Sequence, residues 1–267
     1  MLSEPRLLAV AGWPVGHSRS PAMQQAALDE LAIPWRYLRL PLPAQLFPET
    51  VRALPEAGYA GLNVTVPHKE AALAVADRSS PRAAAIGAAN TLSFSDGAVV
   101  AENTDAPGLI AALGEEVAGR SALVLGAGGA GRAAVWALRE AGAEVSVWNR
   151  TAERARMLAG ELGVGHAETP GQFDVLVNTT SAELEAGVDP LQALGLSGLA
   201  PPPLVVDLVY APGGTALAGW ASDGGSRVVD GREVLVRQGA LSLELWTGRP
   251  APLATMRAAV QNGLDGD

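Results

Sequence analysis

The sequence predicts an α/β protein with a mixed or parallel β-sheet. Short apolar runs typical of buried strands alternate along the chain with segments of helical periodicity. The 267 residues suffice for one large or two modest domains, and 48% of them are hydrophobic against 18% charged. A glycine-rich turn at residues 126–131 lies between a predicted strand and a predicted helix, as in nucleotide-binding α/β domains.

The first half of the chain contains five predicted strands and four predicted helices. The strands are expected at residues 6–11, 35–40, 62–66, 88–94 and 99–102, and the helices at 21–31, 46–57, 70–76 and 106–116. Ser20 is a candidate N-cap of the first helix, because Pro21 follows at a position that tolerates proline. Asp96 and Gly97 are predicted to form a hairpin turn between the last two strands.

The second half continues the alternation of strands and helices. Strands are predicted at residues 122–125, 144–148, 173–178, 204–210 and 227–229, and helices at 130–141, 234–247 and 253–263. On the helix at 234–247, the spacing places Val234, Leu235, Leu241 and Leu245 mainly on the buried side. Gln238 lies in the middle of that helix, where a glutamine is ordinarily solvated.

Charge and composition exclude several classes of function. The net charge of −9 argues against nucleic acid and anionic membranes as partners. The chain has no cysteine, and its three histidines (His17, His68 and His166) form no ligand pattern, so no metal is expected. It shows no signal-peptide pattern and no apolar run of membrane-spanning length, so a cytoplasmic location is expected.

The segment from Gly61 to Lys69 contains the only lysine among the 19 basic residues. A lysine can release a proton near neutral pH, whereas an arginine stays charged. Asn63 and Thr65 alternate with apolar residues and share one face of a predicted strand that Pro67 ends. Lys69 is therefore a candidate proton donor at the wall of a polar pocket. The alternative is that one lysine remains by chance in an arginine-rich chain.

The glycine-rich turn predicts a dinucleotide site. Gly126, Gly128 and Gly131 follow the spacing G-x-G-x-x-G directly after a buried strand and at the start of a helix. In that context the glycines let the backbone approach a pyrophosphate at the helix N-terminus. A glycine-rich turn without a ligand, in a chain rich in alanine and glycine, is the alternative.

The end of the next strand favours NADP over NAD. A site for NAD usually has an acidic residue there to bind the ribose 2′-hydroxyl. Asn149, Arg150 and Thr151 occupy that place instead, and Arg154 follows. Two guanidinium groups suit a 2′-phosphate, although they could also be solvated charges at the start of a helix.

Further candidates follow the later strands of the same half. Thr180, Leu208 and Tyr210 come at or just after the predicted carboxyl ends of two strands. In an open α/β sheet these ends face the ligand crevice. Each of the three could also be a cap or a packed side chain.

Taken together, the motifs resemble the shikimate dehydrogenase family over nearly the whole chain. Any one of them could be a coincidence, but their order and spacing are specific. They are Gly12-x-Pro14-x-x-His17-Ser18-x-Ser20-Pro21, Asn63-Val64-Thr65-x-Pro67-x-Lys69, Gly87-Ala88-x-Asn90-Thr91, Asn103-Thr104-Asp105, Gly126-Ala127-Gly128-Gly129-Ala130, Asn149-Arg150-Thr151 with Arg154, Asp207-Leu208-Val209-Tyr210-x-Pro212, and Gln238-Gly239-Ala240 with Trp246-Thr247-Gly248.

The resemblance implies a role for each matching residue. Lys69 and Asp105 would form the catalytic pair. The substrate would be bound by Ser18, Ser20, Asn63, Thr65, Asn90, Asp105, Tyr210 and Gln238. NADP(H) would be bound by Gly126, Ala127, Gly128, Gly129, Ala130, Asn149, Arg150, Thr151, Arg154, Thr180, Leu208 and Gly231.

The resemblance also implies an architecture and an activity. Two three-layer α/β/α domains would enclose a cleft: a substrate domain at residues 1–105 and a Rossmann-type NADP domain at 106–236, with C-terminal helices at 237–267 packing back on the substrate domain. The implied reaction is the reversible, NADPH-dependent reduction of 3-dehydroshikimate to shikimate in aromatic amino-acid biosynthesis, by a monomer or homodimer.

The chain departs from the family pattern at a few positions, none of them in the expected catalytic pair. Gln24 and Gln25 replace a common His-Asn pair, and Glu183 stands where glycine is frequent. A carboxylate at position 183 would be unfavourable near an anionic cofactor unless it points to water. Two alternatives stay open: a quinate/shikimate dehydrogenase with broader substrate or NAD use, and a non-catalytic NADP-binding sensor.

Overall fold

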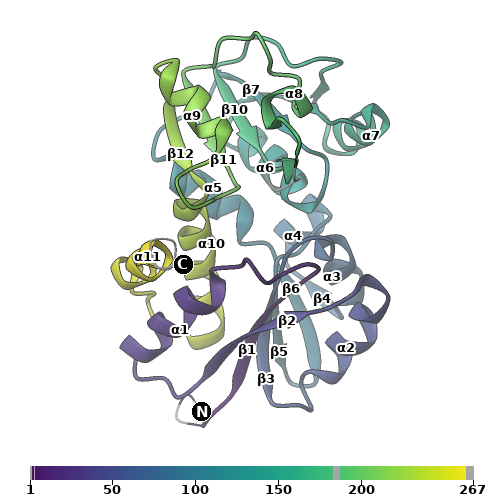
Figure 1. Ribbon diagram of the computed structural model, residues 1–267. Coiled ribbons are helices and arrows are strands. Elements are labelled where there is room, and N and C mark those ends of the chain that lie inside the picture. The colour runs from purple at the N-terminus through teal and green to yellow at the C-terminus, as the bar shows by residue number, and fades with distance from the viewer. Residues whose placement is uncertain (1, 3, 183–186, 263–267) are drawn as a thin grey trace. The chain divides into compact units, whose positions relative to one another are not determined.

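The computed structural model describes residues 2, 4–182 and 187–262 and confirms the α/β class (Figure 1). The chain divides into two compact units. The first unit comprises Met1–Gly108 and Val236–Asp267, and the second comprises Leu109–Leu235. The chain passes from the first unit to the second within helix α5 (Asp105–Leu113) and returns within helix α10 (Gly231–Thr247).

The first unit contains a mixed six-stranded sheet in the order β2-β1-β3-β5-β6-β4. Its strands are β1 (Leu7–Gly12), β2 (Arg36–Pro41), β3 (Tyr59–Val64), β4 (Arg78–Ser79), β5 (Thr91–Ser95) and β6 (Ala98–Glu102). Strands β1, β2 and β3 run parallel, whereas β5 is antiparallel to both of its neighbours. The carboxyl ends of β1 and β3 therefore lie side by side, with Ala11 paired to Val64.

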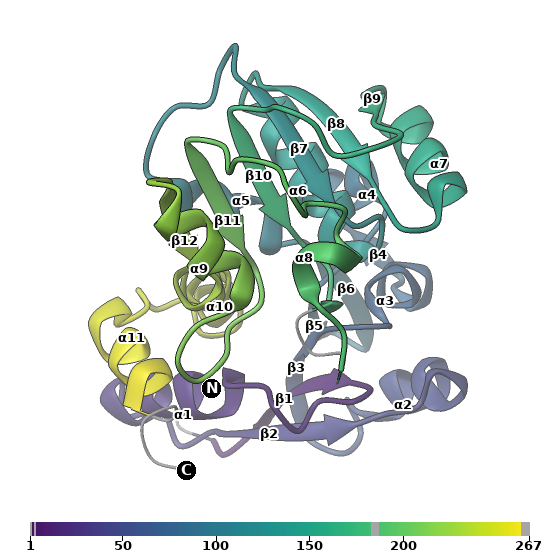
Figure 2. The same ribbon diagram turned by 45° about the horizontal axis from the view of Figure 1, so that its top comes forward.

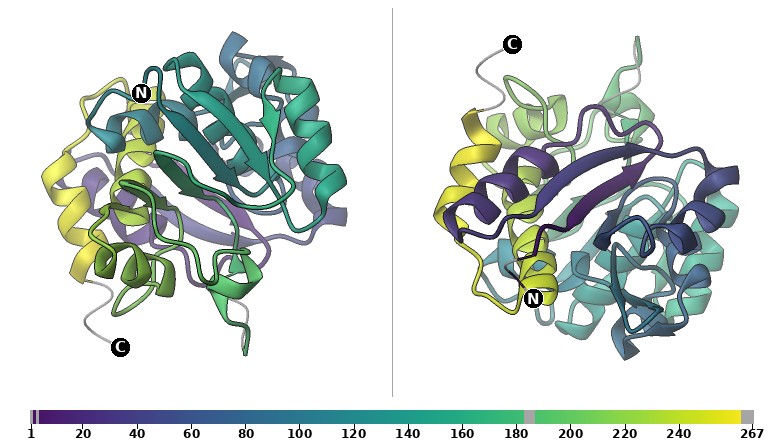
Figure 3. Two further views of the ribbon diagram at one scale, coloured as in Figure 1. Left: turned by 90° about the horizontal axis from the view of Figure 1, so that it is seen from above. Right: turned by 90° about the horizontal axis from the view of Figure 1, so that it is seen from below.

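Helices cover both faces of this sheet. They are α1 (Ser20–Glu30), the 3-10 helix η1 (Ala44–Leu46), α2 (Phe47–Ala53), α3 (Lys69–Val75), α4 (Pro81–Ile86), parts of α5 and α10, and α11 (Leu253–Asn262). Helix α11 packs against α1 (Figure 3). Leu62 and Val64 of β3 enter the apolar core beneath α2 and α3. Because side chains alternate along a strand, Asn63 points to the opposite face, where it contacts Ser242 of α10.

The second unit contains an entirely parallel sheet in the order β12-β11-β10-β7-β8-β9. Its strands are β7 (Ser121–Leu125), β8 (Glu144–Trp148), β9 (Gly165–His166), β10 (Val175–Asn178), β11 (Leu204–Asp207) and β12 (Arg227–Asp230). Helices α6 (Gly129–Glu140) and α7 (Ala152–Leu162) follow β7 and β8, and α8 (Pro190–Ala193) and α9 (Ala216–Asp223) follow β10 and β11 (Figure 2). The strand order reverses between β7 and β10, which is where α/β sheets of this type bind ligands.

Some local expectations were wrong. Strand β3 ends at Val64, and Val66 is 60% exposed, because the chain turns where the His68 amide donates to the Thr65 carbonyl. Ser20 is the first residue of α1 and not its N-cap, which is Arg19 and makes no capping hydrogen bond with its side chain. On α10, Leu245 is 51% exposed, whereas Gln238 is buried.

Several elements were not predicted. Strands β4 and β9 have two residues each, too few for a visible alternation, and α4, α7, α8 and α9 were also missed. Among the described residues, no helix is both long and apolar enough to span a membrane.

Gly61 of β3 generates a prediction about the stability of the first unit. A Cβ atom at this position would lie 2.1 Å from the Trp246 Nε1 atom and 2.7 Å from the Leu92 carbonyl oxygen, to which Trp246 donates a hydrogen bond. We expect Gly61→Ala to lower the free energy of unfolding by about 2 kcal/mol, measured by chemical denaturation. Gly16→Ala is the control, because a Cβ there meets nothing within 4 Å. Equal stabilities of the two variants would contradict the packing described.

Candidate active site

Lys69 and Asp105 form a short ion pair in the first unit. The Lys69 Nζ atom lies 2.6 Å from Asp105 Oδ2, and the two side chains are 12% and 18% exposed. Water therefore screens this pair much less than it screens a surface pair. Each residue is the first of its helix, α3 for Lys69 and α5 for Asp105. The α5 start is fixed by Asn103, whose Oδ1 atom accepts from the Ala106 amide.

Asn90 holds the second oxygen of the Asp105 carboxylate. Its Nδ2 atom lies 2.8 Å from Asp105 Oδ1 and 3.1 Å from Gln238 Oε1. Its Oδ1 atom accepts from the Thr104 backbone amide at 2.7 Å. A backbone N–H can only donate, so this contact fixes which end of the Asn90 amide faces Asp105. Both carboxylate oxygens of Asp105 are therefore held, one by Lys69 and one by Asn90.

Asn63 is fixed in the same way from the β3 side. The Tyr37 hydroxyl donates to Asn63 Oδ1 at 2.7 Å, and burial raises the pKa of Tyr37 well above 10.0, so the phenol remains a donor. Asn63 Nδ2 faces the Asn90 carbonyl oxygen at 3.2 Å, which can only accept. These contacts use most of the hydrogen-bonding capacity of Asn63.

Ser18 and Thr65 lie in the loops that leave the carboxyl ends of β1 and β3, and Ser20 begins α1 directly after the first of these loops. The Trp13 amide donates to the Val66 carbonyl, and the Thr65 amide donates to the Ala11 carbonyl, so the two loops are neighbours. Both serines are buried, and the Ser20 amide donates to Ser18 Oγ at 3.3 Å.

The two loops are also held by residues outside the predicted site. Arg39 of β2 donates twice to the Ser18 carbonyl, at 2.9 and 3.3 Å. Gly12 leaves room for Thr65, because a Cβ at position 12 would lie 2.4 Å from Thr65 Cγ2.

The structure thus links five of the predicted residues directly. Hydrogen bonds connect Asn63, Lys69, Asn90, Asp105 and Gln238 within the first unit. Tyr210 belongs to the second unit.

Sequence reasoning gave no role to Tyr37, Arg39 or Ser242. Ser242 could have been found from its position one helical turn after Gln238, because residues four apart lie on the same face of a helix.

His68 supports the start of α3 although its sequence pattern gave no function. Its ring is buried, stacks on Phe47 with centroids 4.4 Å apart, and donates from Nε2 to the Leu42 carbonyl at 2.6 Å. Burial lowers the pKa of His68 from its ordinary value of 6.5, and the bond to Leu42 opposes this only partly. A neutral His68 therefore anchors the residue that precedes Lys69.

In the second unit, the glycine-rich turn has the form of a phosphate cradle. Gly126 follows β7 with φ of +109°, a conformation that favours glycine. A Cβ at Gly131 would lie 2.2 Å from the Gly126 carbonyl oxygen, whereas a Cβ at Gly128 would meet nothing within 4 Å. Gly128, the N-cap of α6, therefore has open space beside it that a side chain at this position would enter. Thr180 borders the turn, 3.1 Å from a Cβ built on Gly126.

The residues expected to select the cofactor surround the end of β8. Asn149 Nδ2 donates to the Thr151 carbonyl, and Thr151 is the N-cap of α7. Arg150 and Arg154 are exposed there, and neither Asn149 nor Thr151 is acidic.

Leu208 and Gly231 meet elsewhere in the second unit. A Cβ at Gly231 would lie 2.5 Å from the Leu208 carbonyl oxygen. Because Gly231 has no side chain, the start of α10 can lie close to the backbone of Leu208, just after β11.

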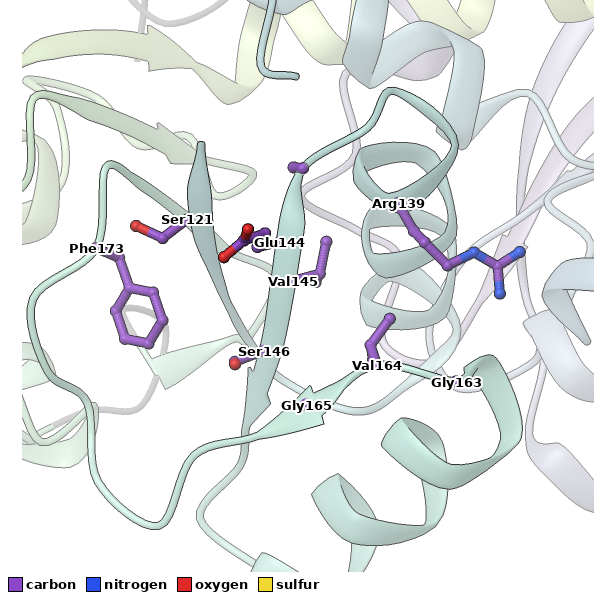
Figure 4. Close-up of a pocket in the computed structure, with 10 residues that line it drawn as sticks. Ser121, Arg139, Glu144, Val145, Ser146, Gly163, Val164, Gly165 and Phe173 are labelled. Atoms are coloured by element: carbon purple, nitrogen blue, oxygen red, sulfur yellow. The ribbon is translucent and has the colours of Figure 1, made fainter. Parts of the chain in front are cut away.

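A separate hollow in the second unit does not contain the predicted cofactor residues. It is lined by Ser121, Glu144, Ser146 and Phe173, among others (Figure 4). Ser121 and Glu144 begin β7 and β8, so the hollow lies near the opposite ends of these strands from the glycine-rich turn.

The structure describes no metal-binding group. Among the described residues, no cluster of three or more His, Cys, Asp or Glu side chains could hold a metal ion. Glu183, expected near the cofactor, lies outside the described residues.

The lowered pKa of His68 generates a prediction about pH and stability. The unfolded chain takes up this proton before the folded chain does, so the free energy of unfolding should decrease as the pH falls below about 6.5. His68→Phe should lack that part of the decrease, measured by chemical denaturation at a series of pH values. His166→Gln is the control, since the His166 side chain is 41% exposed, and it should keep the decrease. An identical pH dependence in His68→Phe and the wild type would contradict the account.

Three family models match successive parts of the chain. The model of the shikimate dehydrogenase substrate binding domain matches residues 10–92, the model of shikimate/quinate 5-dehydrogenase matches 109–184, and the model of the shikimate 5′-dehydrogenase C-terminal domain matches 231–261.

Individual relatives and solved structures agree with these models. The chain is 46% identical to shikimate dehydrogenase (NADP(+)) of Methylobacterium radiotolerans, with 92% of each chain covered. The shikimate dehydrogenase structure from Aquifex aeolicus has a TM-score of 0.89 at 32% identity, covering 98% of this chain and 99% of that one. The enzyme from Thermus thermophilus, solved in complex with NADP(H) and shikimate, has a TM-score of 0.85 at 40% identity, covering 97% and 100%. The chain belongs to the shikimate dehydrogenase family.

Proposed function

We propose that this protein catalyses the reversible, NADPH-dependent reduction of 3-dehydroshikimate to shikimate, a step in aromatic amino-acid biosynthesis. The observation that carries the proposal is the partly buried pair of Lys69 and Asp105, held by Asn90, in a chain of the shikimate dehydrogenase family. A non-catalytic NADP-binding sensor would need the glycine-rich turn but not this pair.

Reduction of a ketone requires a hydride at the carbonyl carbon and a proton at the carbonyl oxygen. NADPH supplies the hydride when it is bound. Lys69 donates the proton from Nζ, and its positive charge stabilises the negative charge that develops on the oxygen. Asp105 orients Lys69 and favours its cationic form. In the reverse direction, neutral Lys69 accepts the hydroxyl proton.

The polar residues around this pair suit a substrate with several hydroxyl groups and a carboxylate. Asn90 and Gln238 are already linked to the pair, and Asn63 adjoins Asn90. We assign the hydroxyls of Ser18, Ser20 and Thr65 to the same substrate, and Tyr210 of the second unit as a further contact. The relative from Thermus thermophilus was solved with shikimate, which supports this substrate class.

The second unit fits NADP(H). The turn from Gly126 to Ala130 leaves space at the N-terminus of α6 for a pyrophosphate, and Thr180 borders it. Asn149, Arg150, Thr151 and Arg154 are assigned to the adenosine 2′-phosphate. Leu208 and Gly231 are assigned to the remainder of the cofactor.

A turnover assay tests the proposal against its alternatives. Shikimate and quinate are each offered with NADP⁺ and with NAD⁺, and formation of the reduced cofactor is followed by absorbance. We expect shikimate with NADP⁺ to be the best combination. Comparable rates with quinate or NAD⁺ would indicate the broader quinate/shikimate dehydrogenase, and cofactor binding without turnover would indicate a sensor.

The assembly and location remain predictions. We expect a monomer or homodimer, which light scattering on the purified chain would measure. A cytoplasmic location is expected for an enzyme of this pathway, and cell fractionation would test it.

Lys69 generates the first functional prediction. Lys69→Ala should lower kcat by about 10²-fold or more with a smaller change in KM, because the proton donor is lost while most of the substrate contacts remain. Glu70→Ala is the matched control, since it removes an exposed charge from the next position of α3. A near wild-type rate in Lys69→Ala would refute the assignment.

Arg150 generates the second functional prediction. Arg150→Ala should reduce the preference for NADPH over NADH about tenfold, because a charge-assisted contact to the 2′-phosphate is lost. Arg156→Ala on α7, the helix that begins just after Arg150, is the control, since Arg156 pairs with Glu153 and Glu168. The readout is the ratio of kcat/KM for the two cofactors. An unchanged ratio in Arg150→Ala would place the phosphate site elsewhere.

A further inference from the structure

Ser242 is a buried hydroxyl of α10 that no motif singled out. It lies one helical turn after Gln238 and is 0% exposed. Leu62 and Val64 fill the other face of the sheet, so Ser242 lies on the face to which Asn63 points. Its surroundings come from three segments distant in sequence: β3, β5 and the turn before α5.

The Ser242 Oγ atom is the meeting point of a hydroxyl triangle. It lies 2.8 Å from Thr91 Oγ1 and 3.1 Å from Thr104 Oγ1, and the two threonine oxygens are 3.2 Å apart. All three residues are at most 1% exposed. Asn63 Nδ2 donates to Ser242 Oγ at 3.0 Å.

The protons of this cluster can be accounted for. Ser242 donates its proton to the Gln238 carbonyl at 3.1 Å, so its two lone pairs can accept from two of its three other neighbours at a time. Thr91 and Thr104 each lie within 3.3 Å of Asn90 Oδ1, which gives their protons a second acceptor. Among the described residues, Gln24 Oε1 is the one buried side-chain atom without a hydrogen-bond partner, so no member of the triangle is left unsatisfied.

The triangle connects the two amides that border the catalytic pair. On one side it contacts Asn63 Nδ2, and on the other Thr104 Oγ1 lies 2.9 Å from Asn90 Nδ2, the atom that also donates to Asp105, and 3.2 Å from Asn90 Oδ1. Without the Ser242 hydroxyl, Asn63 loses one acceptor, and the two threonine hydroxyls can reorient. A buried network that is only partly satisfied loses its unique arrangement.

Thr247 shows what a merely structural hydroxyl on the same helix looks like. It is also buried and donates to the carbonyl four residues earlier, Leu243, at 2.7 Å. Its only other hydrogen bond among the described residues comes from the Arg249 amide. Ser242 makes the same backbone bond but in addition contacts three polar side chains.

We propose that Ser242 is a positioning residue for the reaction: through Asn63 and the hydroxyls of Thr91 and Thr104, its hydroxyl adds to the hold of the Thr104 backbone amide on Asn90 and so helps to keep Asn90 in place beside Asp105. The inference rests on the proposed function, because it assigns a kinetic effect to the pair of Lys69 and Asp105. Ser242 does not contact either residue of that pair directly.

The test compares Ser242→Ala with Thr247→Val in the full chain. We expect Ser242→Ala to lower kcat about tenfold, because the net contribution of one hydrogen bond corresponds to a factor of about ten. KM for NADP⁺ should stay unchanged, because the glycine-rich turn belongs to the second unit. Thr247→Val should lose stability without losing kcat. If Ser242→Ala does not fold, Ser242→Cys, which is similar in size and only a weak donor, takes its place.

A spectroscopic readout separates positioning from turnover. In ¹⁵N-labelled wild type, the side-chain amide protons of Asn63 and Asn90 should exchange slowly with solvent. In Ser242→Ala both should exchange about tenfold faster, whereas in Thr247→Val they should not.

Each outcome decides one claim. A folded Ser242→Ala with wild-type kcat and wild-type amide exchange would overturn the positioning role, and so would an equal loss of kcat in Thr247→Val. A wild type that does not turn over shikimate would instead overturn the proposed function, and the amide exchange would then still decide whether Ser242 fixes the two amides.

Discussion

The ion pair between Lys69 and Asp105 is the interaction on which the rest of the first unit depends. Two charged groups taken partly out of water are stable only if their remaining hydrogen-bonding positions are also filled. Lys69 and Asn90 hold the two oxygens of Asp105, and Thr104 fixes the Asn90 amide. The turn before α5, the start of β5 and the middle of α10 must therefore meet at one place.

The N-termini of helices α3 and α5 add an electrostatic effect to this arrangement, because each carries a partial positive charge. Asp105 begins α5, where the partial positive charge of a helix N-terminus favours a carboxylate. Lys69 begins α3, where the same effect opposes an ammonium group. Asp105 thus compensates for an unfavourable position of Lys69. The lysine is needed at this point for its proton, since an arginine could not release one.

The second unit uses a helix N-terminus for the opposite purpose. The N-cap of α6, Gly128, has open space beside it, and Gly131 allows the helix to approach the Gly126 carbonyl oxygen. An anion fits there for the same electrostatic reason that favours Asp105 at α5.

Sequence reasoning captured the features that repeat or alternate. It predicted the class, the longer strands and the glycine-rich turn, because apolar periodicity and glycine spacing are local signals. It misjudged Val66, because the turn after Val64 depends on a hydrogen bond between His68 and Thr65. Helical spacing alone favoured a solvated Gln238 and a buried Leu245, because spacing does not reveal which face of α10 meets β3 and β5.

The residues of the candidate site likewise fall into those that a local sequence motif reveals and those that only the structure reveals. The residues of the catalytic pair stood in recognisable motifs, and Lys69 was conspicuous as the only lysine. Ser242 and Tyr37 could not be found in this way, because each acts on Asn63 through a contact between distant segments. Their side chains carry no pattern of their own, and only the folded sheet brings them together.

The central claim is that Lys69 and Asp105 act as one unit, and a double-mutant cycle on kcat tests it most directly. Lys69→Ala, Asp105→Ala and the double variant are compared with the wild type at saturating shikimate and NADP⁺. Because residues that act as a unit are not additive, the double variant should be no slower than the slower single variant. Losses that multiply in the double variant would show that the two residues act independently and would contradict the account.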